Sequence, residues 1–430
     1  MDIGLKNNGK IMPIIIVAVV LLVIVPLMLS EDIVNFIVSI LSLIFTYFSI
    51  LSINRNNLKS YNVFALFYFG ALFTSTWSLS SFQTSKNIHD IYFYFIGPSC
   101  FILVLYLFEI KQKIYLPKVK PFLNIHLLYT VFLVIFIGVK LYIGFTVGWR
   151  IDSLKDSTYL ESGRDYVIPG VSGLVAIIQW QLLIFAPYVK RKYVICAVVA
   201  IVILTGILHV KRGDVIRLMM FLFIWFLNNQ LNGKGYSLGK KVKTIVIIIF
   251  GFLLFVESGN IRQTARGGSM NDLKSNIGMN YAPVSVAWFY GYVSINFEVV
   301  RYYFNTNPSN APSSITSLFS GEDETTEVSD NHSINGFNAS TFIAGFIKDY
   351  NYLYFLEMTF FGLIIGTLLV IIKGQEFIGV YLFILSFLAL SFFGNYLSNR
   401  SIFFAILSAM VLYPFLRLKK SNNKLTLNNK

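Results

Sequence analysis

The chain has 430 residues, of which 56% are hydrophobic and only 13% are charged, and its mean hydropathy is +0.66. These values exclude an ordinary soluble domain and indicate a protein whose solvent is largely lipid. The net charge of +14 does not indicate nucleic-acid binding, because the excess falls in loops on one side of the predicted membrane. There it serves as an anchor against anionic lipid.

Runs of about 17 to 25 mainly apolar residues predict transmembrane helices. In chain order the sequence holds twelve such runs, near residues 11–29, 33–53, 61–79, 91–108, 125–145, 168–188, 193–210, 215–227, 245–256, 352–372, 377–397 and 401–416. No cleavage-site pattern follows the first run, so we expect it to remain as an anchor. The fold class that follows is an all-α polytopic integral membrane protein, in which residues 1–430 form a single transmembrane helical domain.

Basic residues in the loops predict the orientation of these helices. They cluster on one side, at residues 6–10, 55–59, 111–120, 190–192, 234–243, 373 and 419–430. By the positive-inside tendency this side is cytoplasmic, so both termini are expected in the cytoplasm. On this topology eight of the eleven arginines lie outside, whereas eighteen of the lysines lie inside. Because arginine grips phosphate bidentately, the segregation indicates an anionic substrate on the outer side.

Two outer segments are long enough to carry chemistry, the first outer loop at 146–167 and a large outer loop at 257–351 between helices 9 and 10. Within the large loop, residues 281–304 are aromatic and apolar, which predicts an interfacial or re-entrant helix. A thirteenth span at this place is the alternative, and it would invert everything after it. Residues 305–340 have the composition of a lid or cap.

The tight outer turn after the seventh span carries Lys211, Arg212 and Asp214, with Arg217 one turn deeper. Charged residues at this depth are costly, so we expect a functional role, a clamp for pyrophosphate at the lipid boundary. The alternative is a local Arg212–Asp214 pair, with Arg217 extending outward to the membrane surface.

Other outer arginines are candidates for the same anion. Arg262 and Arg266 are four residues apart, hence on one face of a helix, and the alternative for them is a solvated turn. Arg150 and Arg164 are offset by neighbouring acidic residues. Arg400 stands at the outer mouth of the last hairpin, where it is either a ligand or a helix cap. No nucleotide-binding loop, dinucleotide fingerprint or metal-ligand spacing occurs in the sequence, so no cofactor and no metal are expected.

Three stretches carry a resemblance to a known family: KRGDVIRLMMF at 211–221, YGYVSINFEVV at 290–300 and STFIAGFIKDYNYLYFLEMTFFGLIIG at 340–366. With the overall architecture, they make the chain similar to the O-antigen polymerases of the Wzy type, bacterial oligosaccharide repeat-unit polymerases. The chain departs from related O-antigen ligases, whose histidine-led motif begins at His332 but meets Ile343 where a glycine is expected.

The resemblance implies a glycosyltransferase of the bacterial inner membrane that acts at its outer face on undecaprenyl-diphosphate-linked donor and acceptor. It implies a chain-length regulator and a flippase of the same pathway as partners, and neither metal nor nucleotide sugar. The basic residues would hold pyrophosphate: Arg212, Arg217, Arg262, Arg266, Arg400, Lys211, Arg150 and Arg164. Asp349 or Asp214 would act as the base for the acceptor hydroxyl. The alternatives are an O-antigen ligase and a lipid-linked oligosaccharide flippase or transporter.

Overall fold

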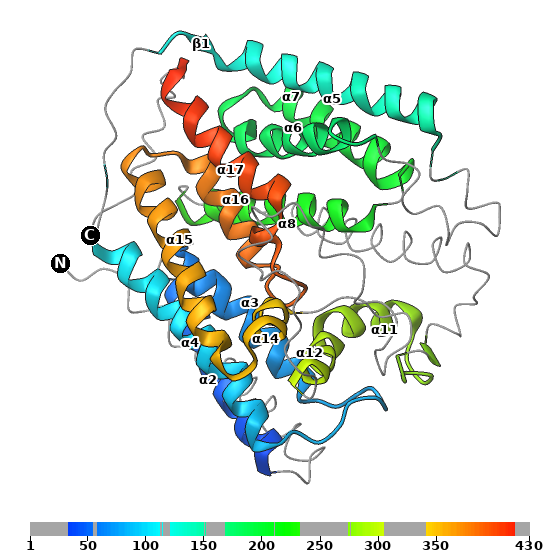
Figure 1. Ribbon diagram of the computed structural model, residues 1–430, viewed down its shortest axis with the longest axis vertical. Helices are drawn as coiled ribbons and strands as arrows, with labels where there is room; N and C mark the ends of the chain where they lie inside the picture. Colours follow the sequence, from blue (N-terminus) through cyan, green and yellow to red (C-terminus); the bar gives the residue numbers. More distant parts are fainter. Residues whose placement is uncertain are drawn as a thin grey trace, which may run out of the picture.

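The structure is a computed structural model that describes residues 33–54, 58–111, 114, 121–149, 151, 168–209, 211–232, 274–275, 277–304 and 341–417. These ranges are mostly helical, and their only strands form one pair of two residues each (Figure 1). The predicted spans 11–29 and 245–256, most of the first outer loop and the lid segment 305–340 lie outside the described residues.

The first half of the chain forms seven described α-helices. They are α2 (Ile33–Asn54), α3 (Ser60–Ser75), α4 (Ile88–Lys111), α5 (Ile125–Val147), α6 (Val171–Phe185), α7 (Arg191–Ile201) and α8 (Arg212–Asn232). A short 3-10 turn, η4 (Ala186–Tyr188), follows α6. The last part of α7 widens into a π-helix, η5 (Val202–Ile207), a feature that is frequent at functional sites.

The second half begins with a continuous helical run made of α11 (Val284–Tyr290), the π-helix η6 (Gly291–Ile295) and α12 (Asn296–Phe304). It continues with α14 (Ala344–Tyr350), η7 (Asn351–Leu353), α15 (Tyr354–Gly374), α16 (Ile378–Leu388), η8 (Tyr396–Ser398), α17 (Arg400–Leu412) and η9 (Tyr413–Phe415). Strand β2 (Leu416–Arg417) then pairs in parallel with β1 (Leu123–Asn124).

Among the described residues, five helices are long and apolar enough to cross a membrane: Ile33–Ile53, Ile88–Glu109, Ile125–Val147, Val171–Tyr188 and Ala344–Gly374. Two shorter apolar helices, Ile378–Leu388 and Arg400–Phe415, lie in the last part of the chain. The protein is therefore predominantly α-helical, with several helices suited to a lipid bilayer, as its composition predicts.

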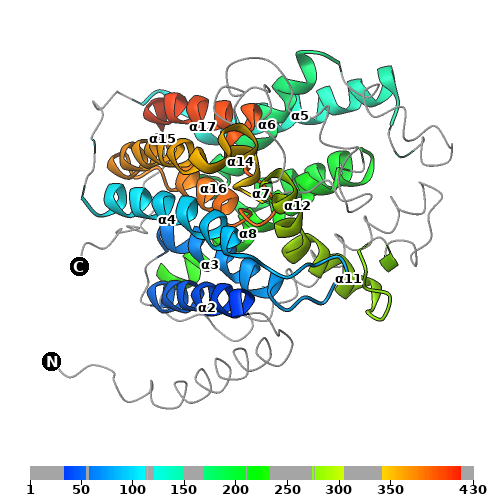
Figure 2. The ribbon, with the colours of Figure 1, turned by 60° about the horizontal axis from the view of Figure 1, so that its bottom comes forward.

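The most extensive helix packing joins α4 to α15, and α2, α4 and α15 lie in successive layers (Figure 2). Glycine residues allow α4 and α15 to pack closely. A Cβ on Gly97 would collide with the Tyr354 ring, and one on Gly366 would lie 2.8 Å from the Phe108 ring. Gly362 and Gly366 are four residues apart, which places two small residues on the same face of α15, a pattern typical of close packing between membrane helices.

One end of the bundle is held by Glu109 at the end of α4. Its Oε2 accepts a hydrogen bond from the backbone of Ser60 at 2.8 Å, and its Oε1 accepts one from the Tyr381 hydroxyl at 2.8 Å. Lys373 forms an ion pair with the same carboxylate at 3.2 Å. The contacts join the first turns of α3 and α16 to the last turns of α4 and α15, and we call this region the Glu109 end.

The run 284–304 lies across the opposite end, which we call the Arg301 end. Ser294 is hydrogen bonded to Thr74 at the end of α3, at 2.9 Å between the hydroxyls. Arg301 pairs with Asp90 at the start of α4, and Asn296 donates to the carbonyl of Phe392 in the turn before α17. One helical run thus contacts the tips of two hairpins, α3–α4 and α16–α17. Whether this run is interfacial or a thirteenth span stays a prediction.

Two predicted boundaries are wrong. The span predicted at 377–397 ends as a helix at Leu388, where Leu390 and Ser391 donate turn hydrogen bonds to the carbonyls of Phe387 and Leu388. The span predicted at 61–79 ends at Ser75, where the hydroxyl groups of Ser75 and Thr76 bond to carbonyls of the preceding turn. In both places local hydrogen bonding terminates the helix before the apolar run ends.

Candidate anion-binding site

Three of the residues predicted in the turn before α8 are visible in detail. Arg217 donates to Asp214 with 2.7 Å between Nη1 and Oδ1, and both side chains are half-buried. The guanidinium lies 4.2 Å from the ring centroid of Tyr396 and 5.8 Å from that of Trp180. Lys211 is exposed just before the helix, and the side chain of Arg212 lies outside the described residues. Among the described side chains, Asp214 is paired with Arg217.

Lys140 of α5 is a further cation at this place, one that the sequence prediction missed. Its side chain is buried, with 7% of the residue exposed, and it interacts electrostatically with both Lys211 and Asp214. The described cluster thus contains three basic residues and one acidic residue. The sequence does carry a signal for Lys140, because it is a lone lysine inside an apolar run. An ionisable residue at membrane depth indicates function by default.

Residues at the start of α17 also border the cluster. The Trp180 indole donates to the Ser401 hydroxyl at 3.2 Å, and Asn399 accepts from the Ser401 backbone as the N-cap of α17. Arg400 follows this cap at the first helical position, so the cap role predicted as its alternative belongs to Asn399. Burial raises the pKa of Tyr396 to about 12, although Arg217 opposes the shift. Tyr396 therefore keeps its proton at physiological pH.

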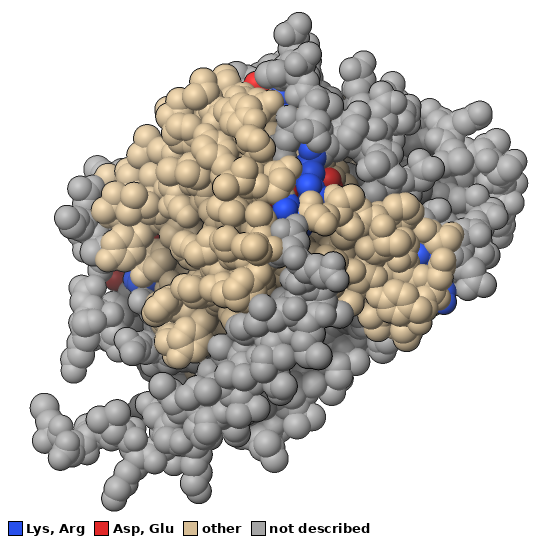
Figure 3. Space-filling model, turned by 90° about the horizontal axis from the view of Figure 1, so that it is seen from below, with Lys and Arg blue, Asp and Glu red and all other residues tan. Residues whose placement is uncertain are grey.

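The arrangement favours an anion. The net charge of Lys140, Lys211, Arg217 and Asp214 is positive, and the N-terminus of α8 adds the partial positive charge of its backbone N–H groups. Partial burial limits screening by water and salt, so the charges act strongly on a bound group. Seen from below, most of the described surface is uncharged, with a few basic and acidic atoms between larger uncharged areas (Figure 3).

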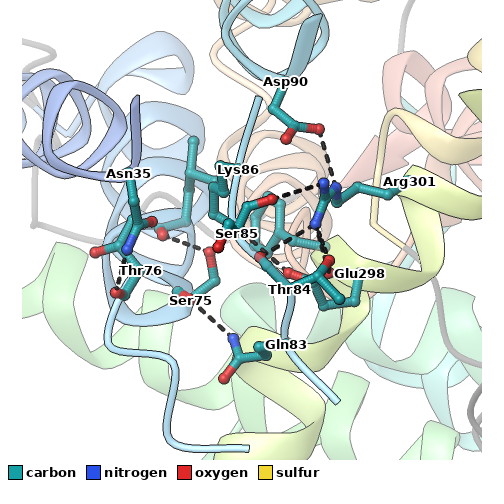
Figure 4. A network of polar contacts seen from close by, with 12 residues as sticks. Asn35, Ser75, Thr76, Gln83, Thr84, Ser85, Lys86, Asp90, Glu298 and Arg301 are labelled. Atoms are coloured by element: carbon teal, nitrogen blue, oxygen red, sulfur yellow. Dashed lines mark hydrogen bonds and ion pairs between the residues drawn. The ribbon is translucent and has the colours of Figure 1, made fainter. Parts of the chain in front are cut away.

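A second charged group at the Arg301 end is of a different kind (Figure 4). Lys86 pairs with Glu298 at 3.2 Å, and Arg301 pairs with Asp90 at 3.1 Å and with Glu298 at 3.2 Å. Arg301 also donates to the carbonyl of Ser85 at 3.0 Å and to the hydroxyl of Thr84. Two cations thus face two carboxylates within one network.

This network is neutral and largely buried, so it has no excess charge for a substrate. Burial by itself would lower the pKa of Arg301, but Glu298, Tyr94 and Asp90 raise it above the usual value, so the guanidinium stays charged. The contacts fasten α12 to the loop between α3 and α4. Arg301 is therefore a structural arginine whose charge is already paired.

Asp349, the first candidate base, lies half-buried in the last turn of α14, which packs against α12 and α15. Asp214, the second candidate, is engaged by Arg217 and so orients that guanidinium. Four predicted phosphate ligands, Arg150, Arg164, Arg262 and Arg266, lie outside the described residues. The structure thus brings Arg217, Lys211 and the start of α17 into one region.

Comparisons with protein-family models, curated proteins and solved structures gave no match. Within the described ranges, no group of three or more His, Cys, Asp or Glu residues is placed to hold a metal ion.

Proposed function

We propose that the protein is a membrane glycosyltransferase that polymerises undecaprenyl-diphosphate-linked oligosaccharide repeat units into O-antigen or a related surface polysaccharide. The observation that carries the proposal is the excess of positive charge formed by Lys140, Lys211 and Arg217 against Asp214. A diphosphate is an anion that such a set of donors binds well, since charge-assisted hydrogen bonds to phosphate are the strong ones. The sequence resemblance supplies the lipid carrier and the glycan.

The proposed topology has twelve spans, with both termini in the cytoplasm of a bacterial cell and the Arg301 end outside the inner membrane. Loop charge supports it, because Lys59 and Lys190 to Lys192 lie at the tips of the described helices that face away from the Arg301 end. The described tips at the Arg301 end carry the anion-binding cluster and the interfacial run 284–304.

The proposed reaction moves the growing glycan from its carrier to the next repeat unit. A hydroxyl oxygen of the acceptor sugar forms a bond to the anomeric carbon of the donor, and the bond from that carbon to the diphosphate oxygen breaks. Undecaprenyl diphosphate leaves with its negative charge, which Arg217, Lys211 and Lys140 stabilise. The proton of the acceptor hydroxyl passes to a carboxylate, for which Asp349 is the first candidate and Asp214 the second.

The test uses purified protein reconstituted in liposomes and supplied with lipid-diphosphate-linked repeat units. A ladder of products spaced by one repeat unit, with release of undecaprenyl diphosphate, is the expected result. Transfer of a single glycan to lipid A core would identify a ligase. Movement of the lipid-linked unit across the bilayer with no new glycosidic bond would identify a flippase. Either outcome would replace the proposal.

A further inference from the structure

Several uncharged polar side chains surround the turn between α16 and α17 without any hydrogen-bond partner for some of their buried atoms. Within the part of the chain that the structure describes, such atoms are Asn296 Oδ1, Thr341 Oγ1, Ser391 Oγ and both amide atoms of Asn395. Asn296 and Ser391 are themselves fully buried. Buried polar groups are almost always bonded to something, so these atoms mark a place for water or a ligand.

The same turn holds a row of aromatic rings. Trp288 and Tyr292 are stacked, with 5.4 Å between centroids and 7° between planes, and Tyr292 lies 5.0 Å from Phe393. Phe393 is 6.0 Å from Tyr396, and that ring lies under the guanidinium of Arg217 at 4.2 Å. The row therefore runs from the interfacial helix to the anion-binding site.

Polar atoms and rings occupy one small region. The side chain of Asn296 reaches the turn by donating to the carbonyl of Phe392 at 3.0 Å. The backbone of Phe342, next to Thr341, donates to the carbonyl of Ser391 at 2.7 Å. Hydroxyl and amide groups from α12, from the segment before α14 and from the turn thus meet beside half-buried aromatic faces.

We propose that the residues around the 391–396 turn form a glycan-binding subsite, which holds the sugar adjoining the diphosphate. Sugars present hydroxyl groups, which pair with amides and hydroxyls, and C–H faces, which lie on aromatic rings. Water would satisfy the polar atoms alone, whereas a sugar uses the rings as well. The subsite contains uncharged donors and acceptors, so its ligand is a neutral part of the substrate. The identity of that substrate as a lipid-linked oligosaccharide rests on the proposed function.

The experiment measures saturation transfer by NMR from the purified full-length protein in nanodiscs to a lipid-free glycan. The probe is the oligosaccharide released by mild acid from the lipid-linked pool of the source cells. Inorganic pyrophosphate, followed by phosphorus NMR line broadening, is a second probe for the anion site. The test variant is Asn395→Ala, and Phe393→Leu is the second. The matched control is Asn124→Ala, the same substitution in the cap of α5 at the other end of the bundle.

We expect Asn395→Ala and Phe393→Leu to weaken glycan binding at least tenfold and to leave pyrophosphate binding within twofold of the wild type. Asn395→Ala should not lower the melting temperature, because neither amide atom bonds to described protein groups. Glycan binding that is unchanged in both variants would overturn the subsite, even if the protein makes a polymer. If both variants lose glycan binding and the wild-type protein makes no polymer, the subsite is supported and the polymerase function is rejected.

Discussion

Arg217 is held between two partners, since it donates to Asp214 at 2.7 Å and lies 4.2 Å from the ring of Tyr396. The carboxylate fixes the position of the guanidinium, and the ring covers one of its faces. A guanidinium held in this way keeps N–H groups for a further anion, because arginine has five donors. Its Nε has no hydrogen-bond partner among the described residues.

Replacing Arg217 by lysine tests whether geometry as well as charge matters. Lysine keeps the charge but loses the planar fork and most of the contact with Tyr396. Losing one charge-assisted hydrogen bond costs about 1.5 to 3 kcal/mol, so we expect turnover to fall roughly 10- to 100-fold. The measurement is the initial rate of product formation in liposomes. Arg191→Lys, an exposed arginine at the start of α7, is the control and should retain the wild-type rate.

Lys140 offers a test in which stability and activity move in opposite directions. Lys140→Met removes a buried cation that is desolvated and repelled by the charge of Lys211, so the melting temperature should rise by a few degrees, which corresponds to roughly 1 kcal/mol or more. Affinity for pyrophosphate should fall at the same time, because one of three cations is lost. A variant that is less stable and binds pyrophosphate normally would show that Lys140 has a structural role only.

The network around Glu298 predicts a large loss of stability. In Glu298→Gln the ammonium group of Lys86, whose side chain is only 2% exposed, loses its ionised partner. Breaking a buried ion pair on one side costs about 3 to 5 kcal/mol. Thermal unfolding should show this loss, and the double variant Lys86→Met, Glu298→Gln should recover much of it. Glu376→Gln, an exposed glutamate near the Glu109 end, should unfold like the wild type.

A change at the Glu109 end should affect stability without affecting chemistry. Tyr381→Phe removes the hydroxyl that donates to Glu109 at 2.8 Å, which costs about 1 to 3 kcal/mol because the carboxylate loses a buried partner. Activity per folded molecule should stay at the wild-type value, because the anion-binding site lies at the other end. A selective loss of activity in a folded Tyr381→Phe protein would mean that the two ends are coupled.

Apolar periodicity predicts most of the described helices, because the requirement to satisfy backbone groups in lipid leaves little choice of structure. It does not predict where a helix ends inside an apolar run, as at Leu388, since that depends on local turn hydrogen bonds. Arg217 and Lys211 can be singled out from the sequence, because they are basic residues on the predicted outer side, against the positive-inside tendency. Tyr396 and Trp180 are not, because an aromatic residue near a membrane boundary has many roles and only the fold places these two beside Arg217.

The central claim is that the cationic cluster binds the diphosphate of a lipid-linked glycan during polymerisation. The most direct measurement compares product ladders from wild-type protein and from an Arg217→Lys, Lys140→Met double variant, reconstituted at equal levels with lipid-diphosphate-linked repeat units. The account predicts a ladder from the wild type and none from a folded double variant. Equal ladders from both proteins, or no ladder from the wild type, would contradict it.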